Sequence, residues 1–203
     1  MTTYAEAGTL ARYARAVVRE ALGDAAAIPP QGAVFDEPGA SFVSLHWVGG
    51  ELQGCIGSLE PRRTLAADVA KNARAAALDD PRARRLSLDE ADALDVEVSV
   101  LGPIEPIVAE DEDAARAQLD AGIDGVVFVW RQHRATFIPQ MWDHFGDART
   151  LVAELKLKAG VPADFWAPDA QLLHYRATIG IDPAPLRENT SAAHPPDGEP
   201  PRR

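Results

Sequence analysis

The sequence is poor in cysteine and in cationic residues. Cys55 is the only cysteine among 203 residues, which excludes an intramolecular disulfide framework and a zinc site built from several cysteines. Lysine and arginine number 20 against 31 aspartates and glutamates, a formal net charge of −11. Because attraction between cations and phosphates supplies most non-specific affinity for nucleic acids, we expect no nucleic-acid partner. The one basic run, Arg82 with Arg84 and Arg85, is interpreted as a solvated loop.

Several familiar site patterns are also missing. No apolar run approaches the roughly 20 residues that span a bilayer, and the start of the chain has no secretory pattern. We therefore predict a cytoplasmic protein that does not contact membranes. Neither a GxxxxGK[ST] loop nor a GxGxxG turn occurs, so nucleotide cradles of those types are excluded. The five histidines occur singly, without an HxH or HxxxH pair, and we predict no metal site.

What the sequence does contain is a cysteine between two glycines, in the stretch ELQGCIGSLEP at residues 51–61. Gly54 and Gly57 remove side-chain cover around Cys55, and glycine lets backbone approach a ligand or adopt positive φ. A thiolate nucleophile needs a lowered pKa, which an imidazolium or backbone N–H groups supply. We predict an accessible thiol with a pKa below its ordinary value. The alternative is a small residue at a tight turn.

The preceding segment predicts which face Cys55 occupies. Residues 42–48 alternate between apolar and polar side chains, as in a half-buried strand, and Gly49-Gly50 is typical of a two-residue hairpin turn. In that register the pairs are Val48 with Glu51, Trp47 with Leu52, His46 with Gln53, Ser44 with Cys55 and Val43 with Ile56. His46 then lies diagonal to Cys55, about 7–8 Å away, and is a candidate general base. His144, in a loop after a strand, is the second candidate.

The remaining pattern predicts an α+β fold with a mainly antiparallel sheet. Capping residues and apolar spacing indicate helices that start after Thr3, Thr64, Ser87, Asp111 and Asp147, the fourth running to about residue 121. Strands are indicated at residues 96–100, 126–130, 135–138 and 173–179, the middle two joined by a four-residue connection. We predict one domain over residues 1–181. Residues 182–203 hold six prolines and few large apolar side chains, and we predict that they form a disordered tail.

Five short segments, in the same order, resemble motifs of the AMMECR family. LQGCIGSL at residues 52–59 is similar to its LRGCIGSL signature and DPR at 80–82 to its DPRF motif. LDVEVSVL at 94–101 resembles its strand that ends in SVL, IPQMW at 138–142 its LPQVW segment, and LKAGVP at 157–162 its KAGLP segment. The likeness extends from about residue 5 to residue 180. The branch it resembles most is protein A of the bacterial AmmeMemoRadiSam system.

This resemblance implies one compact domain with two related subdomains and a groove beside the GCIG loop. We expect the groove to be lined by ligand-binding residues, namely Gln53, Gly54, Gly57, Ser58, Gln140 and Trp142. Two positions depart from the family pattern: Gln53 stands for an arginine, whose charge it cannot replace, and Ala83 stands for a phenylalanine.

The resemblance leaves the reaction, the cofactor and the oligomeric state undefined. One hypothesis is an enzyme that uses Cys55 to modify a small molecule or a partner protein. The alternative is a non-catalytic adaptor or ligand carrier that docks a Memo-like protein or a radical SAM protein, the two partners that the resemblance implies. An adaptor needs no activated sulfur, so the reactivity of Cys55 distinguishes the two classes.

Overall fold

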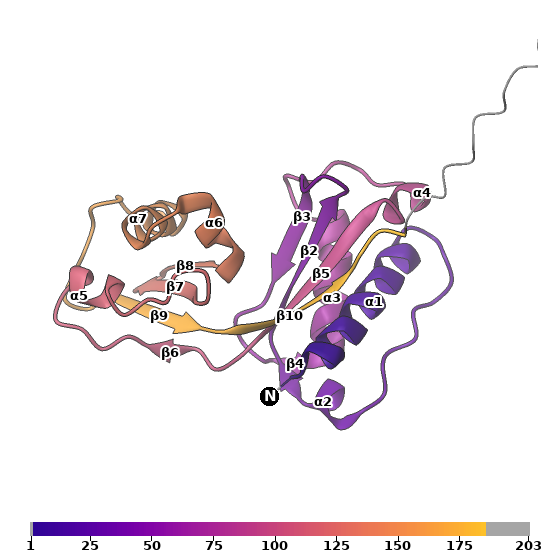
Figure 1. Cartoon of the computed structure of the whole chain (residues 1–203), viewed down its shortest axis with the longest axis horizontal. Coiled ribbons are helices and arrows are strands. Elements are labelled where there is room, and N and C mark those ends of the chain that lie inside the picture. The colour runs from indigo at the N-terminus through magenta and orange to yellow at the C-terminus, as the bar shows by residue number, and fades with distance from the viewer. Residues whose placement is uncertain (1, 186–203) are drawn as a thin grey trace, which may run out of the picture.

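The computed structural model describes residues 2–185 and divides them into two lobes (Figure 1). The first lobe comprises residues 2–102 and 177–185, and the second lobe comprises residues 103–176. Each lobe is built on a four-stranded sheet in which every pairing is antiparallel. This arrangement confirms the predicted α+β class. Within residues 2–185 no helix is long and apolar enough to cross a bilayer.

The sheet of the first lobe has the strand order β10-β5-β2-β3. Its strands are β2 (Ser41–Trp47), β3 (Leu52–Gly57), β5 (Leu94–Leu101) and β10 (Ala177–Asp182). Helices α1 (Tyr4–Ala21) and α3 (Leu65–Leu78) cover one face, and the second lobe stands on the side of the other face (Figure 1). The shorter elements are α2 (Ala33–Asp36), α4 (Leu88–Ala91) and the paired strands β1 (Pro38–Gly39) and β4 (Arg63–Thr64).

Helices α1, α3 and α4 of the first lobe begin where the sequence predicts. Thr3 and Glu6 form a capping box at the start of α1, and the Thr64 hydroxyl accepts a hydrogen bond from the Ala67 N–H at the start of α3. Their apolar faces pack on alternate residues of β2 and β5, such as Val43 and Val98, both fully buried. The small side chains of α3 let its backbone lie close against β3.

The sheet of the second lobe has the strand order β6-β9-β7-β8. Its strands are β6 (Glu105–Pro106), β7 (Gly125–Trp130), β8 (His133–Phe137) and β9 (Gln171–Tyr175). The helical elements are α5 (Glu112–Arg116), η1 (Pro139–Met141), α6 (Trp142–Phe145) and α7 (Ala148–Lys158). The last of these is capped by Asp147, as predicted. Helix α5 ends five residues before the predicted end, and the β7–β8 turn contains two residues rather than four.

The last predicted strand, residues 173–179, is two strands in two different sheets. β9 pairs with β7 and β6 in the second lobe, and after Arg176 the chain enters the first lobe as β10 and pairs with β5. The alternation of side chains continues across the junction, so the pattern alone gives no sign of a break. This segment is one of the connections between the lobes (Figure 1).

The boundary of the predicted tail at residue 182 is wrong. Asp182 belongs to β10, where its carboxylate and carbonyl group accept hydrogen bonds from Arg15. The Ala184 N–H donates to the Asp95 carboxylate at 2.8 Å. An ion pair with a helix thus holds residues that composition alone assigns to a tail. The rest of the predicted tail, residues 186–203, lies outside the described residues.

The hairpin β2–β3 contains a β-bulge that the predicted register lacks. Two predicted pairs are confirmed, Val43 with Ile56 and Ser44 with Cys55. Beyond Leu45 the register shifts, so that His46 pairs with Leu52 and Gln53 is the extra residue. Because a bulge reverses the side-chain alternation on one strand, Gln53 leaves the face of Cys55 and Leu52 becomes 39% exposed.

Candidate functional site

Cys55 lies on the face of the first sheet that α1 and α3 do not cover. Ser44 on β2 pairs with both Cys55 on β3 and Glu97 on β5. Side chains of directly paired residues lie on the same face, so these three form one row across three strands. The Ser44 hydroxyl is 3.2 Å from the Cys55 sulfur and donates to it. The row therefore places a thiol, a hydroxyl and a carboxyl group side by side.

The backbone of Cys55 is held by the DPR motif that follows α3. The Asp80 carboxylate accepts the Cys55 N–H at 2.8 Å and forms a two-pronged ion pair with Arg82, whose guanidinium also donates to the Cys55 carbonyl. The hydrogen bonds from Arg82 and Cys55 hold the pKa of the Asp80 carboxyl at about 2 although its side chain is almost fully buried. Arg82 is therefore part of the site and does not belong to a merely solvated loop.

The electrostatics of the thiol differ from the sequence-based prediction. Burial raises the pKa of the Cys55 thiol, while the Ser44 hydroxyl and the charges of Arg82 and Lys158 act in the opposite direction. The largest influence is burial, because the half-buried sulfur loses water that would stabilise a thiolate. At neutral pH the free protein thus holds a protonated thiol, and the predicted lowering of its pKa is not found.

Glu97 is the carboxyl group that faces the second lobe from the same row. Gln140 in η1 donates through its Nε2 to the Glu97 carboxylate at 2.5 Å and to the Ser99 hydroxyl at 3.2 Å. Burial raises the pKa of Glu97, and the charge of His46 lowers it by a smaller amount. A carboxylate with a raised pKa is a stronger base than an ordinary one. Gln140, predicted as a groove residue, therefore links the two lobes at the row of Cys55.

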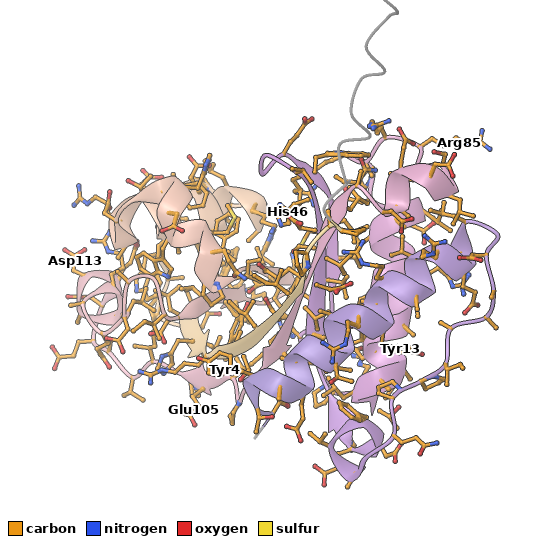
Figure 2. The ribbon with its side chains drawn as sticks, turned by 45° about the vertical axis from the view of Figure 1, so that its right-hand side comes forward. Tyr4, Tyr13, His46, Arg85, Glu105 and Asp113 are labelled. Carbon is orange, nitrogen blue, oxygen red and sulfur yellow. The ribbon has the colours of Figure 1, made fainter. Side chains whose placement is uncertain are left out.

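Within residues 2–185, neither of the two candidate histidines contacts the Cys55 sulfur. His46 is on the sheet face that looks toward the second lobe (Figure 2), and its charge is a secondary influence on the pKa of Glu97 but is not among the influences on the pKa of Cys55. His144 is exposed on α6 and packs edge-on against Phe145. As partners of Cys55, both remain predictions without a supporting contact.

The two glycines near Cys55 allow other atoms to approach the backbone closely, but these atoms belong to the protein itself. A Cβ atom at Gly54 would lie 2.2 Å from the Ala76 carbonyl oxygen of α3, and one at Gly57 would lie 2.1 Å from the ring of Phe42. Neither glycine has positive φ. Gly54 therefore faces the helix, and only Gly57 lies on the side that is open to the second lobe.

Two further predicted groove residues serve the packing instead. Gln53 is buried, accepts a hydrogen bond from the Trp47 indole at 3.1 Å and donates to the Arg84 carbonyl at 2.6 Å. Trp142 is buried in the second lobe, where its indole donates to the Asp124 carbonyl at 2.7 Å. Gln53 uses its amide within the fold, so its position contributes no charge to the groove.

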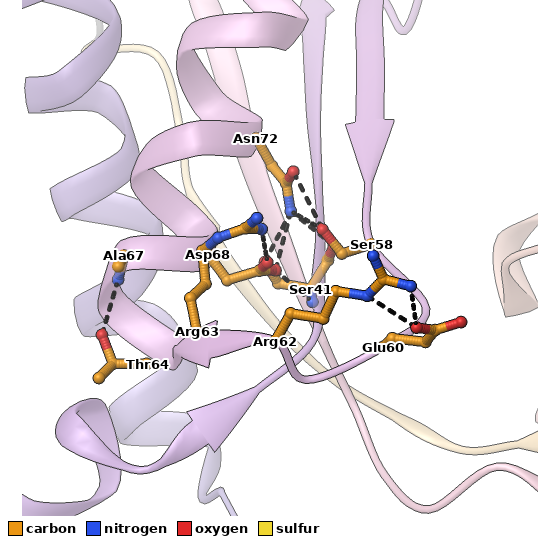
Figure 3. A network of polar contacts seen from close by, with 9 residues as sticks. All are labelled: Ser41, Ser58, Glu60, Arg62, Arg63, Thr64, Ala67, Asp68 and Asn72. Carbon is orange, nitrogen blue, oxygen red and sulfur yellow. Dashed lines mark hydrogen bonds and ion pairs between the residues drawn. The ribbon is translucent and has the colours of Figure 1, made fainter.

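Ser58 connects the end of β3 to a buried polar network (Figure 3). Asp68 in α3 is fully buried and accepts hydrogen bonds from the Ser41 N–H and hydroxyl, from Asn72 and from Arg63. The Ser58 hydroxyl is 3.4 Å from the Asn72 amide. This network fixes the strand edge on which Ser58 lies.

Sequence reasoning missed four residues of the site, Glu97, Asp80, Arg82 and Lys158, and it placed Ser44 opposite Cys55 without giving it a role. Ser44 and Glu97 carry a usable signal, since both point away from the apolar face of their alternating strands. Asp80 could have been found from the DPR motif, but its contact with Cys55 depends on tertiary structure. The described residues contain no cluster of three or more side chains that could hold a metal ion.

Comparison with known proteins gives consistent matches over most of the chain. The model of the AMMECR1 family matches residues 11–180. Protein MJ0810 of Methanocaldococcus jannaschii is 36% identical over 188 residues, covering 90% of this chain and 94% of its own. A Thermotoga maritima protein is 35% identical over 147 residues, covering 72% and 78%. The crystal structure of the uncharacterized protein PH0010 from Pyrococcus horikoshii superposes with a TM-score of 0.80 at 31% identity, covering 89% and 97%.

Proposed function

The chain belongs to the AMMECR1 family, and from that premise we propose that it is an enzyme in which Cys55 attacks an electrophilic substrate bound between the lobes. The row of Cys55, Ser44 and Glu97 carries this proposal. It places a nucleophile, a hydroxyl and a base next to one another on three adjacent strands, on the face that looks toward the second lobe. Arg82 and Lys158 favour the thiolate as it forms.

A protonated thiol needs a base before it can react. Ser44 lies beside Cys55 and is the direct cross-strand partner of Glu97, with Cβ atoms of such partners about 4.5–5.5 Å apart. Rotation of the hydroxyl allows it to accept the thiol proton and to pass its own proton to the carboxylate. The raised pKa of Glu97 suits it to this task, because a general base works best with a pKa close to the working pH.

The rate of iodoacetamide labelling of Cys55 from pH 5 to 10 tests the relay. We expect the rate near neutral pH to fall about tenfold in Glu97→Gln and in Ser44→Ala. Glu51→Gln, which removes an exposed carboxylate from the same hairpin, is the matched control and should leave the rate unchanged. Equal rates in all four proteins would remove the relay and leave Cys55 as a packing residue.

The raised pKa of the thiol favours a second candidate function, a non-catalytic adaptor or carrier. In this role the groove docks a Memo-like or radical SAM protein, and the chain is the AMMECR component of a three-protein system. The support is that Cys55 is protonated in the free protein and that Gln53 offers no charge. Two results together would favour this function. A purified Memo-like partner would bind both the native chain and Cys55→Ser, and the labelling rate of Cys55 would be unchanged in Glu97→Gln and Ser44→Ala.

A further inference from the structure

A separate pocket opens where the loop between β3 and β4 meets β8 of the second lobe. Its volume is about 470 Å³. The lining residues come from β2, the end of β3, the β3–β4 loop, β4, α3 and β8, and they are Phe42, Gly57, Ser58, Leu59, Glu60, Arg62, Arg63, Lys71, Arg134, Ala135 and Thr136. Both lobes therefore contribute to one pocket.

The charge of this pocket is opposite to that of the chain. Four cationic side chains line it, Arg62, Arg63, Lys71 and Arg134, against one carboxylate, Glu60. The whole chain carries a formal charge of −11. A protein with so few cations places four of them around one pocket, where each repels the others unless an anion lies between them.

Glu60 shows how an anion is held there. Its carboxylate pairs with Arg62 at 2.6 Å and with Arg134 of the second lobe at 3.1 Å. Arg62 and Glu60 are labelled in Figure 3 beside the polar network. Nearly half of the Glu60 side chain is exposed, so a competing oxyanion can reach the same guanidinium groups. The carboxylate of Glu60 thus occupies part of the position that a ligand anion would take.

The wall of the pocket on the side of the first lobe is held in place. Arg63 pairs at 2.8 Å with Asp68, which is fully buried in the Ser41–Asn72 network. Within residues 2–185 Lys71 has no ion pair, and its ammonium group remains available. Guanidinium groups bind phosphate and carboxylate oxygens through paired hydrogen bonds, and the lysine adds a mobile positive charge.

A larger cavity elsewhere between the lobes lacks this character. It has a volume of about 1340 Å³, and its lining contains one arginine, Arg176, together with Glu37 and Glu105. Arg176 is paired with Asp120 at 2.9 Å. Of these two pockets, only the smaller one is lined by several cationic side chains.

We propose that the smaller pocket binds the oxyanionic group of a small molecule, a phosphoryl group or a dicarboxylate, and that the bound anion bridges Arg62 and Lys71 of the first lobe to Arg134 of the second. The size of the pocket suits a small ligand and the overall negative charge repels a polyanion, so a nucleic acid is not the occupant. This site does not depend on the chemistry of Cys55, although Gly57 lines it two residues from the thiol.

Isothermal titration calorimetry at low ionic strength with the full chain tests the site. The probes are inorganic phosphate, pyrophosphate and malonate, which distinguish a phosphoryl ligand from a dicarboxylate. We expect Arg134→Gln and Lys71→Gln each to weaken binding about tenfold, and Glu60→Gln to strengthen it because a competing carboxylate is removed. Arg131→Gln changes the charge equally on the same hairpin but outside the pocket, and it should have no effect.

Two further controls keep the outcome interpretable. Circular dichroism melting identifies any variant that fails to fold. Because the side chains of Lys71 and Arg134 are exposed, we expect both of these variants to fold. Cys55→Ser should bind the anions as the native chain does, so this site can fail or hold independently of the proposed enzyme. If none of the three probes binds the native chain, or if Arg131→Gln weakens binding as much as Arg134→Gln, the proposal is overturned.

Discussion

The two lobes both bury charged groups, but they use them differently. In the first lobe Asp80 and Asp68 bond to backbone N–H groups of the strands, those of Cys55 and Ser41. In the second lobe Lys156 is 1% exposed and bonds to both carboxylate oxygens of Glu112 and to the Phe165 carbonyl. Neither Glu112 nor Phe165 belongs to β8 or η1, whose residues Arg134 and Gln140 contact the first lobe.

Stability and the thiol site are coupled in the first lobe and separate at the buried ion pair of the second lobe. A buried carboxylate that holds the Cys55 backbone cannot be changed without moving the thiol. The ion pair of Lys156 can be broken at a similar cost in stability while the row of Cys55, Ser44 and Glu97 stays in place. We therefore expect variants in the first lobe to alter stability and thiol chemistry together, and those of the second lobe's buried pair to alter stability alone.

The largest effect on stability is expected for Gly54→Ala, at the residue that precedes Cys55 and faces α3. The new Cβ would lie 2.2 Å from the Ala76 carbonyl oxygen, and helix backbone cannot rotate away as a side chain can. We expect a loss of more than about 4 kcal/mol in the free energy of unfolding, measured by urea denaturation. Gly8→Ala in α1 is the control, because its Cβ meets nothing closer than 3.8 Å and should stabilise the helix. Similar stability of the two variants would contradict the packing of α3 on β3.

A smaller effect is expected for Glu112→Ala in the second lobe. It leaves the buried Lys156 ammonium without its carboxylate, which costs about 3 kcal/mol in the free energy of unfolding. The labelling rate of Cys55 in the folded protein should not change, whereas Glu110→Ala, at an exposed position close in sequence, should change neither quantity. A shift of the labelling profile in Glu112→Ala would break the distinction between the lobes.

Much of this fold follows from local signals in the sequence. Caps such as Thr3, Thr64 and Asp147 specify the helix starts, because each side chain satisfies an N–H group of the first turn. Alternation of apolar and polar residues predicts β2 and β5, because only one face of these strands packs against the helices. These signals depend on neighbours within a few residues, so they can be read without the tertiary structure.

The parts that could not be predicted depend on distant contacts. The bulge at Gln53 is stabilised by Trp47 and by the Arg84 carbonyl, 31 residues away in the chain. The raised pKa of Cys55 results from burial between elements, which the two flanking glycines do not reveal. The GCIG, DPR and IPQMW segments, which the resemblance singles out, lie together in the fold, but Gln53, Gly54 and Trp142, which it assigns to a groove, face the packed interior.

The smallest expected effect is the pH dependence contributed by Asp80. Its carboxyl has a pKa of about 2 in the folded protein against an ordinary value of 3.8. Because the folded-state pKa is the lower one, the carboxylate stabilises the fold fully above about pH 4, and this contribution disappears as the pH falls from about 4 to about 2. The shift corresponds to roughly 2 kcal/mol in the free energy of unfolding.

We expect Asp80→Asn to remove this contribution at neutral pH and to flatten the fall in stability between pH 4 and pH 2, as followed by urea denaturation at each pH. Asp79→Asn is the matched control. The Asp79 carboxylate is exposed, so this variant measures the effect on stability of losing one negative charge alone. Because other carboxyl groups titrate in the same range, the difference between the two variants isolates Asp80.

Asp80→Asn should also change the labelling profile of Cys55, since the neutral amide holds Arg82 more weakly and the charge of Arg82 favours the thiolate. Parallel stability profiles together with an unchanged labelling profile would show that the buried carboxylate is no more closely tied to the site than the Lys156 ion pair of the second lobe.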